Sequence, residues 1–329
     1  MTARSIPLNL FGIPFGLTGL AGAWLAVAHQ GHAWPGVGAI LLLLAALTWL
    51  LVTGSYLRYA LAARSIVSDL VDPVRAPFAS LFTIVPMVLA ADGLYPRAPT
   101  AGRLVVDVFL VLTIVLGAWF TGQWMYRGVR LDQFHPGHFL PTVAGGLLAA
   151  RAAAQVGQHQ LGEVMFGLGM ICWLVLGSLI LGRLLFRPPL PPALLPTMAI
   201  EVAPAAVATL AWFSLYGDRV TPVVSLFAGY GLLMVLAQLR LLPAFVRLPF
   251  ASSTWAFTFS WAAVATTVIH WVAQLSPAGA QFYEYVVLAV VTALIGGIGV
   301  RTLVAVARRQ FPAPPARVAP PARTTPWPT

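Results

Sequence analysis

The sequence predicts an all-α polytopic membrane protein with ten transmembrane helices, and three observations lead to that prediction. The 329 residues are 59% hydrophobic and only 9% charged, whereas a soluble domain of this length needs a charged surface. Apolar runs of about 20 residues, the length that crosses the hydrocarbon core of a bilayer, recur along the chain. The segments between these runs are short, so consecutive helices should form antiparallel hairpins with no inserted soluble domain.

The limits of the apolar runs divide the chain into one membrane domain and a tail. The first span should be kept, because no Ala-x-Ala cleavage site follows it. Residues 312–329 are rich in proline and cannot build a core, so we expect a disordered cytoplasmic tail. Residues 1–311 then hold the ten spans, at about 8–29, 36–60, 76–95, 104–126, 138–157, 160–185, 197–216, 220–242, 252–274 and 282–307.

The basic residues indicate the topology. The formal net charge is +10, and all nineteen basic residues are arginines. With a cytoplasmic N-terminus, fifteen of them fall on inside segments, and only Arg97, Arg103, Arg151 and Arg219 fall on outside segments. This asymmetry predicts that both termini are cytoplasmic. Arginines confined to alternate loops and the tail do not form a continuous basic surface of the kind that binds nucleic acid. We therefore expect the protein to interact with the lipid bilayer and not with nucleic acid.

A repeat distinguishes the odd-numbered spans from the even-numbered ones. Four odd spans carry an interior proline followed by small residues (Pro14, Pro86, Pro141 and Pro204), whereas the even interiors carry none. A mid-helix proline bends the helix, and in lipid the freed carbonyl is tolerated only beside protein or a water-filled cavity. We therefore expect five hairpins in a pseudo-fivefold ring, with the odd helices around a central pore. The alternative is tight packing of kinked helices with no passage.

The ninth span departs from this repeat. It has Ser260 where the others have proline, preceded by Phe259. A phenyl ring in a narrow pore closes it sterically and by dewetting, so Phe259 is the candidate gate, and the alternative is an ordinary packing residue. The candidate pore-lining and kink positions are Pro14, Gly16, Thr18, Pro86, Pro141, Gly145, Pro204, Phe257 and Ser260.

Three charged residues are candidates for the mouths of the pore, because charge inside a membrane is costly and usually paired or functional. Arg151, towards the outer end of the fifth span, either attracts anions, pairs with Asp92 or Glu163, or extends to the outer membrane interface. Asp92, late in the third span, is expected to be structural. Glu201, three residues before Pro204, would repel anions as a bare carboxylate. It must be neutral, paired with an arginine, turned away from the pore, or the proton carrier of a coupled transporter.

No other chemistry is indicated by the residue patterns. His135 and His138 have a spacing that a metal could use, but only Asp132 accompanies them. The single cysteine, Cys172, lies within an apolar run. No catalytic triad, carboxylate pair or phosphate-binding loop stands out. We expect no metal, no cofactor and no enzymatic activity.

Short motifs in a fixed order resemble those of the tellurite-resistance/dicarboxylate transporter family, the bacterial TehA proteins, whose plant relatives are the guard-cell slow anion channels. The resemblance covers nearly the whole chain apart from the tail. It implies a homotrimer in a bacterial inner membrane, with ten helices around a pore in each subunit and a blocking phenylalanine that falls on Phe259. Glu201 departs from the family pattern, which tends to be uncharged there. The motifs include Phe11-Gly12-Ile13-Pro14-Phe15, Asp72-Pro73-Val74-Arg75, His135-Pro136, Gly229-Tyr230-Gly231 and Trp255-Ala256-Phe257-Thr258-Phe259.

Three functions remain open. We expect a channel that passes small inorganic monovalent anions, such as chloride or nitrate, and is gated by Phe259. The second hypothesis is a proton-coupled transporter of dicarboxylates or tellurite-type oxyanions, with Glu201 as proton carrier. The third is a membrane scaffold that transports nothing.

Overall fold

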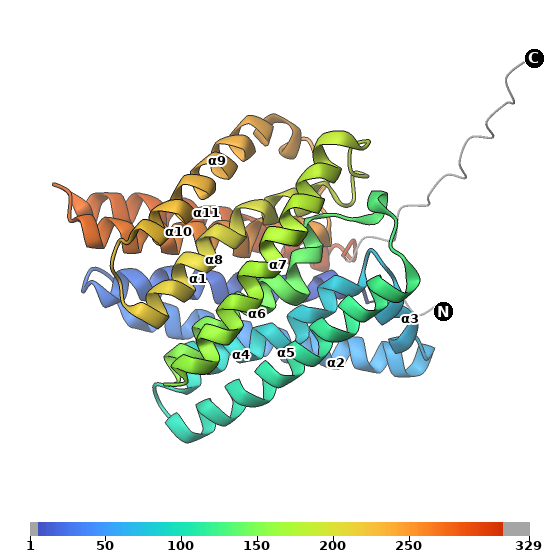
Figure 1. Ribbon diagram of the computed structural model, residues 1–329, viewed down its shortest axis with the longest axis horizontal. Coiled ribbons are helices and arrows are strands. Elements are labelled where there is room, and N and C mark those ends of the chain that lie inside the picture. The colour runs from blue at the N-terminus through green and yellow to red at the C-terminus, as the bar shows by residue number, and fades with distance from the viewer. Residues whose placement is uncertain (1–5, 312–329) are drawn as a thin grey trace, which may run out of the picture.

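The computed structural model describes residues 6–311, and these residues form helices with no strand (Figure 1). Arg4 and the expected tail over 312–329 lie outside the described residues. Nine segments of residues 6–311 are long and apolar enough to cross a membrane. They are Leu8–His29, Pro35–Ala63, Ala76–Leu94, Pro99–Arg127, His159–Phe186, Leu195–Tyr216, Pro222–Phe245, Ser252–Leu275 and Ala280–Ala307.

The expected fifth span is the exception. A 3-10 turn, Pro136–His138, leads into a π-helical segment of five residues, Leu140–Ala144, and then into α6, Gly145–Gln155, of eleven residues. Protein surrounds this short helix on most sides. A Cβ on Gly146 would lie only 2.7 Å from the backbone nitrogen of Gly169 in α7, so the two helices pack backbone to backbone. The expectation of ten spans therefore becomes nine long segments in residues 6–311 and one short buried helix.

The prolines of the odd-numbered spans mark changes of helix type. Pro14 and Pro204 lie in the first turn of an α-helix that continues a 3-10 turn, so each proline stands close to the point where the helix changes type. Pro86 lies inside its helix, which ends in a π-helical turn. The segments are η1 Leu8–Phe11 with α1 Gly12–His29, η2 Ala76–Ser80 with α4 Leu81–Leu89 and η3 Ala90–Leu94, η7 Leu195–Val202 with α8 Ala203–Tyr216, and η8 Ser252–Trp255 with α10 Ala256–Leu275.

The even-numbered spans are long outer helices, and α3, Ile66–Val71, is a short helix between the first hairpin and the second. In the most apolar stretch of α2 only 17% of the residues are buried, against 72% in Leu195–Tyr216. Such exposed apolar faces suit contact with lipid. Several boundaries differ from the expectation: α5 begins at Pro99 instead of residue 104, α2 ends at Ala63 instead of residue 60, and α9 continues through Pro243 to Phe245 instead of ending at residue 242. The outer helices are α2 Pro35–Ala63, α5 Pro99–Arg127, α7 His159–Phe186, α9 Pro222–Phe245 and α11 Ala280–Ala307.

The inner helices contact one another in a closed cycle: α1 with α4, α4 with α6, α6 with α8, α8 with α10, and α10 with α1. Figure 1 shows α6 and α8 between the outer helices α5 and α9. The α1–α10 contact is made close by glycines. A Cβ on Gly16 would overlap the Thr258 hydroxyl, and one on Gly19 would lie 2.9 Å from the Cβ of Ala262. These glycines therefore fix how α1 and α10 are rotated against each other.

Candidate functional site

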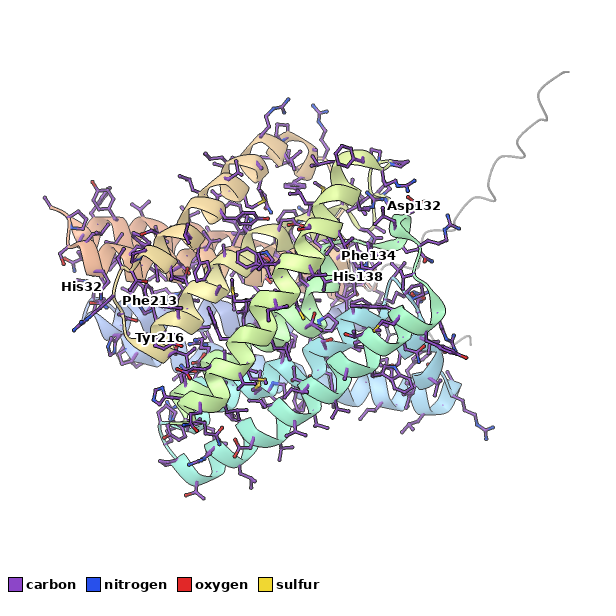
Figure 2. All side chains as sticks on the ribbon, in the orientation of Figure 1. His32, Asp132, Phe134, His138, Phe213 and Tyr216 are labelled. Carbon is purple, nitrogen blue, oxygen red and sulfur yellow. The ribbon has the colours of Figure 1, made fainter. Side chains whose placement is uncertain are left out.

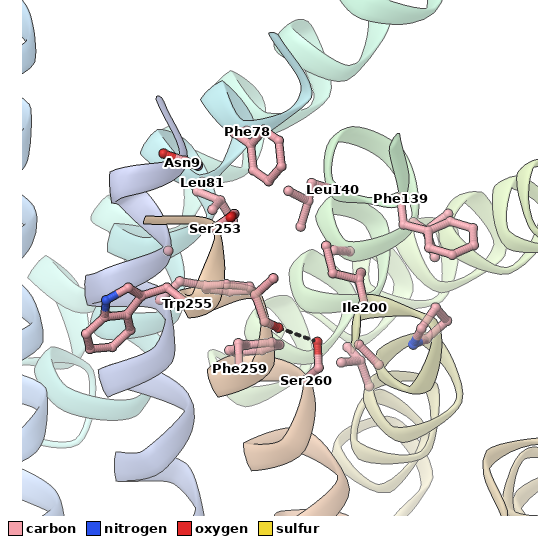
Figure 3. A pocket seen from close by; sticks show the side chains of 18 of the residues that line it. Asn9, Phe78, Leu81, Phe139, Leu140, Ile200, Ser253, Trp255, Phe259 and Ser260 are labelled. Carbon is pink, nitrogen blue, oxygen red and sulfur yellow. Dashed lines mark hydrogen bonds between the residues drawn. The ribbon is translucent and has the colours of Figure 1, made fainter. Parts of the chain in front are cut away.

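All five inner segments contribute to one narrow cavity of about 50 Å³ (Figure 3). Its wall is almost wholly apolar, with a few hydroxyl and amide groups at one end, among them Asn9 and Ser253. Gly12, Ala203 and Ala256 also line it, and they are the first residues of α1, α8 and α10. Each of these α-helices continues a 3-10 turn, and the N–H groups of Gly12, Ala203 and Ala256 are already bonded within it.

Phe259 lines the cavity and is held by α1. Its ring lies parallel to the ring of Phe15, with the centroids 3.6 Å apart and 10° between the planes. One turn further along α1, a Cβ on Gly19 would come within 3.0 Å of the Phe259 ring carbon Cδ2. The Phe259 ring therefore lies flat on α1, and only a residue without a side chain fits beneath it at position 19.

The other candidate pore residues separate into two groups. Pro204 and Ser260 line the cavity with Phe259, and the Ser260 hydroxyl donates to the carbonyl of Ala256 at 3.1 Å (Figure 3). The structure places the other seven candidates away from this lining. Gly16 packs on Thr258, and the ring of Phe257 packs edge-on against Phe245 at 5.0 Å. The remaining five are Pro14, Thr18, Pro86, Pro141 and Gly145, which are buried or nearly buried inside the helix bundle.

Sequence reasoning missed several residues of the lining. Phe15 directly follows Pro14, and its place in the same motif was the available signal. Phe78, Leu140 and Ile200 each come from a different inner segment and line the cavity (Figure 3). Apolar residues of this kind occur in every span, so nothing in the sequence set these three apart.

A second cavity of about 260 Å³ lies at the opposite ends of the inner helices. Figure 2 shows Phe213, which lines it, towards the end of the molecule opposite His138. Arg151 and Asp92 both line this cavity and form a two-pronged ion pair, with Nη2 donating to Oδ1 at 2.8 Å and Nη1 to Oδ2 at 3.1 Å. Gln155 donates to the same carboxylate at 2.9 Å. Of the alternatives for Arg151, pairing with Asp92 is the one observed.

Two histidines and an aspartate line the same cavity. The Nδ1 atom of His270 lies 3.0 Å from Oδ2 of Asp218. This hydrogen bond, followed by the nearby charges of His270 and His29, lowers the pKa of Asp218, although partial burial opposes the shift. Asp218 is therefore a stable negative charge at this cavity.

Glu201 lies inside the protein and does not line the central cavity, although Ile200 and Pro204 on either side of it do. The residue is 5% exposed, and neither carboxyl oxygen has a hydrogen-bond partner among the described residues. It interacts electrostatically with Tyr230 of α9. Glu201 is therefore turned away from the cavity, and no arginine pairs with it in residues 6–311.

The two candidate metal ligands have structural partners. His135 is fully buried; its Nε2 bonds the carbonyl of Val74 at 2.9 Å, and its Nδ1 accepts the N–H of Gly137 at 3.1 Å. Burial lowers the pKa of His135 to about 4, so the ring is neutral at pH 7. His138 packs on the ring of Phe134 (Figure 2), with the centroids 4.5 Å apart. No group of three His, Cys, Asp or Glu side chains suited to a metal occurs in residues 6–311.

Comparison with known proteins gives consistent matches. The family model described as voltage-dependent anion channel, SLAC1, matches residues 5–303. The tellurite resistance protein TehA homolog of Haemophilus influenzae is 30% identical over 266 residues, which cover 80% of this chain and 80% of that protein. The guard cell S-type anion channel SLAC1 of Arabidopsis thaliana is 25% identical over 278 residues, which cover 79% of this chain and 49% of the plant protein.

These matches confirm the resemblance that the motifs predicted. The long apolar helices and the family together identify a multi-pass membrane protein. The chain belongs to the SLAC1/TehA family of membrane anion channels and transporters.

Proposed function

We propose that the protein is a channel for small monovalent anions, such as chloride or nitrate, and that Phe259 is its gate. The observation that carries this proposal is the position of Phe259 in a cavity to which all five inner segments contribute. The path runs between α1, α4, α6, α8 and α10, whose mutual contacts close into a cycle. In this arrangement the short α6 completes a ring of five helices, and the outer helices form five hairpins with them.

The wall of the cavity suits an anion that must pass without being held. A fixed cation would bind an anion too firmly to let it leave. No charged side chain lines the central cavity in the part of the chain that the structure describes. A weaker attraction comes from the backbone dipoles of the joined segments η1–α1 and η8–α10, which begin at Leu8 and Ser252 beside the end of the cavity lined by Asn9 and Ser253. A narrow, mildly positive, largely apolar path therefore favours anions over cations.

Opening requires the Phe259 ring to leave the face of α1. The ring is stacked on Phe15 and fills the space above Gly19. Rotation about its side-chain torsions would move the ring aside without moving the helices. The stack on Phe15 sets part of the free energy that this rotation needs.

The wider setting follows from the family and the arginines. A homotrimer in a bacterial inner membrane is what resemblance to the TehA proteins implies. The excess of arginine on the segments assigned to the inside supports cytoplasmic termini. The end of the central cavity that Asn9 and Ser253 line then faces the cytoplasm, and the second cavity lies towards the outside.

The second candidate function is a proton-coupled carrier of dicarboxylates or tellurite-type oxyanions. It is favoured by Glu201, a buried carboxyl group with no hydrogen-bond partner among the described residues. It also fits the name of the Haemophilus relative, a tellurite resistance protein homolog. Against it, Glu201 does not line the central cavity, so a proton there would have to act through the movement of η7.

Anion uptake into proteoliposomes separates the two functions. Wild type, Phe259→Ala and Glu201→Gln are compared, with Phe257→Ala as matched control, because Phe257 lies on the same helix and packs on Phe245. The channel predicts fast uptake in Phe259→Ala, little in the control, no need for a pH gradient, and no effect of Glu201→Gln. Uptake that saturates, follows a pH gradient and is lost in Glu201→Gln would establish the carrier.

A further inference from the structure

The second cavity carries a set of charges that the gate does not use. Five ionisable side chains line it, one from each of the five inner segments or the residues just after it. They are His29, Asp92, Arg151, Asp218 and His270, and no other ionisable side chain among the described residues lines the cavity. We call this cavity the histidine vestibule.

The fixed side-chain charges of the histidine vestibule, those of Arg151, Asp92 and Asp218, sum to −1. Arg151 and Asp92 neutralise each other through their two-pronged ion pair. Asp218 remains, and its hydrogen bond to His270 keeps it ionised. The helix ends add to this, because His29 and Gln155 are the last residues of α1 and α6, where the helix dipole is negative.

The two histidines decide the sign of the remaining charge. With both rings neutral, the vestibule has a formal charge of −1 from Asp218. With both rings protonated, the formal charge is +1. The His270 side chain is 22% exposed and that of Asp218 is 37% exposed, so water and protons reach the pair. Histidine is the side chain whose charge changes most readily between pH 5 and 8.

We propose that the histidine vestibule is a proton-controlled binding site for a small anion at the entrance to the passage. Protonation of His29 and His270 from the vestibule side reverses the local charge and concentrates anions there. The proposal rests on the proposed anion passage. Two unit charges added about 7 Å from an anion in a water-like dielectric raise its occupancy about five- to tenfold. The effect should fade as salt rises, because exposed charges are screened.

The test uses the Phe259→Ala variant in proteoliposomes, so that the gate does not limit the flux. Chloride uptake is measured at low ionic strength, with the pH lowered from 7.5 to 5.5 on one side at a time. We expect a five- to tenfold rise when acid is applied to the vestibule side and little change from the other side. His29→Gln with His270→Gln should abolish the rise, because glutamine keeps a hydrogen-bond donor but gains no charge. His159→Gln is the matched control, since His159 is exposed and lies outside the vestibule.

Each outcome has a separate meaning. If the Phe259→Ala variant carries no chloride at either pH, the anion passage itself is overturned, and this site falls with it. Flux that is present but insensitive to pH overturns the proton control alone. A rise that persists in the double histidine variant also overturns it, because the titrating group would lie elsewhere.

Discussion

Loss of the Phe15 ring should loosen the gate without removing it. The rings of Phe15 and Phe259 are stacked with centroids 3.6 Å apart and planes within 10°, and both line the central cavity. Aromatic pairs contribute at most about 1.5 kcal/mol beyond the area they bury, and a face-to-face stack contributes less than an offset or edge-on pair. Phe15→Leu keeps an apolar side chain but loses the stack. The equilibrium between closed and open rings should then shift towards open by up to about tenfold.

Single-channel recording in a planar bilayer measures this shift directly. The expected change is in open probability, with little change in the conductance of the open state. In a Phe259→Ala background, Phe15→Leu should add almost nothing, because its partner is already absent and the two effects are coupled. Phe166→Leu is the matched control: Phe166 packs edge-on against Trp212 at 5.8 Å and does not line the cavity. An unchanged open probability in Phe15→Leu, or an effect that adds fully to Phe259→Ala, would refute the stacked gate.

Three further predictions concern stability in detergent, measured by thermal unfolding of the purified protein. Gly16→Ala should lower the free energy of unfolding by about 1–3 kcal/mol, because the added Cβ would overlap the side chain of Thr258 in α10. The control variant Gly54→Ala should leave it almost unchanged, because there is open space around Gly54. Arg151→Ala should lower the free energy of unfolding by about 3 kcal/mol, because it leaves the carboxylate of Asp92, whose side chain is only 5% exposed, without its cation. A change near zero would mean that water takes the place of Arg151 beside Asp92. Acidification from pH 7 to pH 5 should destabilise by about 2 kcal/mol through His135, whose pKa of about 4 lies below that of an unfolded histidine, so the unfolded chain takes up more protons. His135→Gln should remove this part of the pH dependence, and an equal slope in the variant would assign it to other groups.

The main features of the fold could be predicted from the sequence, because lipid imposes simple rules on it. Nine of the ten apolar runs of membrane length correspond to long helical segments in residues 6–311. The restriction of prolines to alternate spans identified the buried helices, since each bend needs surrounding protein or a cavity. The length rule failed for residues 138–157. There the structure has a π-helical turn around Pro141, Leu140–Ala144, followed by the short helix α6, Gly145–Gln155, although the proline rule correctly places this segment among the buried helices.

The site was only partly predictable, because its geometry depends on how helices are rotated against one another. Phe259 could be selected as the break in a repeat. The motif around Pro14 pointed to Phe15, but its stack on Phe259 could not be predicted, since it depends on Gly16 and Gly19 letting α1 approach α10. The pairing of Arg151 joins residues 59 positions apart in the chain. Sequence reasoning could name Asp92 as one of its possible partners, and only the folded arrangement selects it.

The current through a planar bilayer under a chloride gradient tests the central claim most directly. The purified protein and its Phe259→Ala variant are compared with sodium chloride at different concentrations on the two sides. We predict little current in the wild type and a large one in the variant, reversing at the chloride equilibrium potential. A folded variant that carries no current, or a current that reverses at the cation potential, would contradict an anion path closed by Phe259.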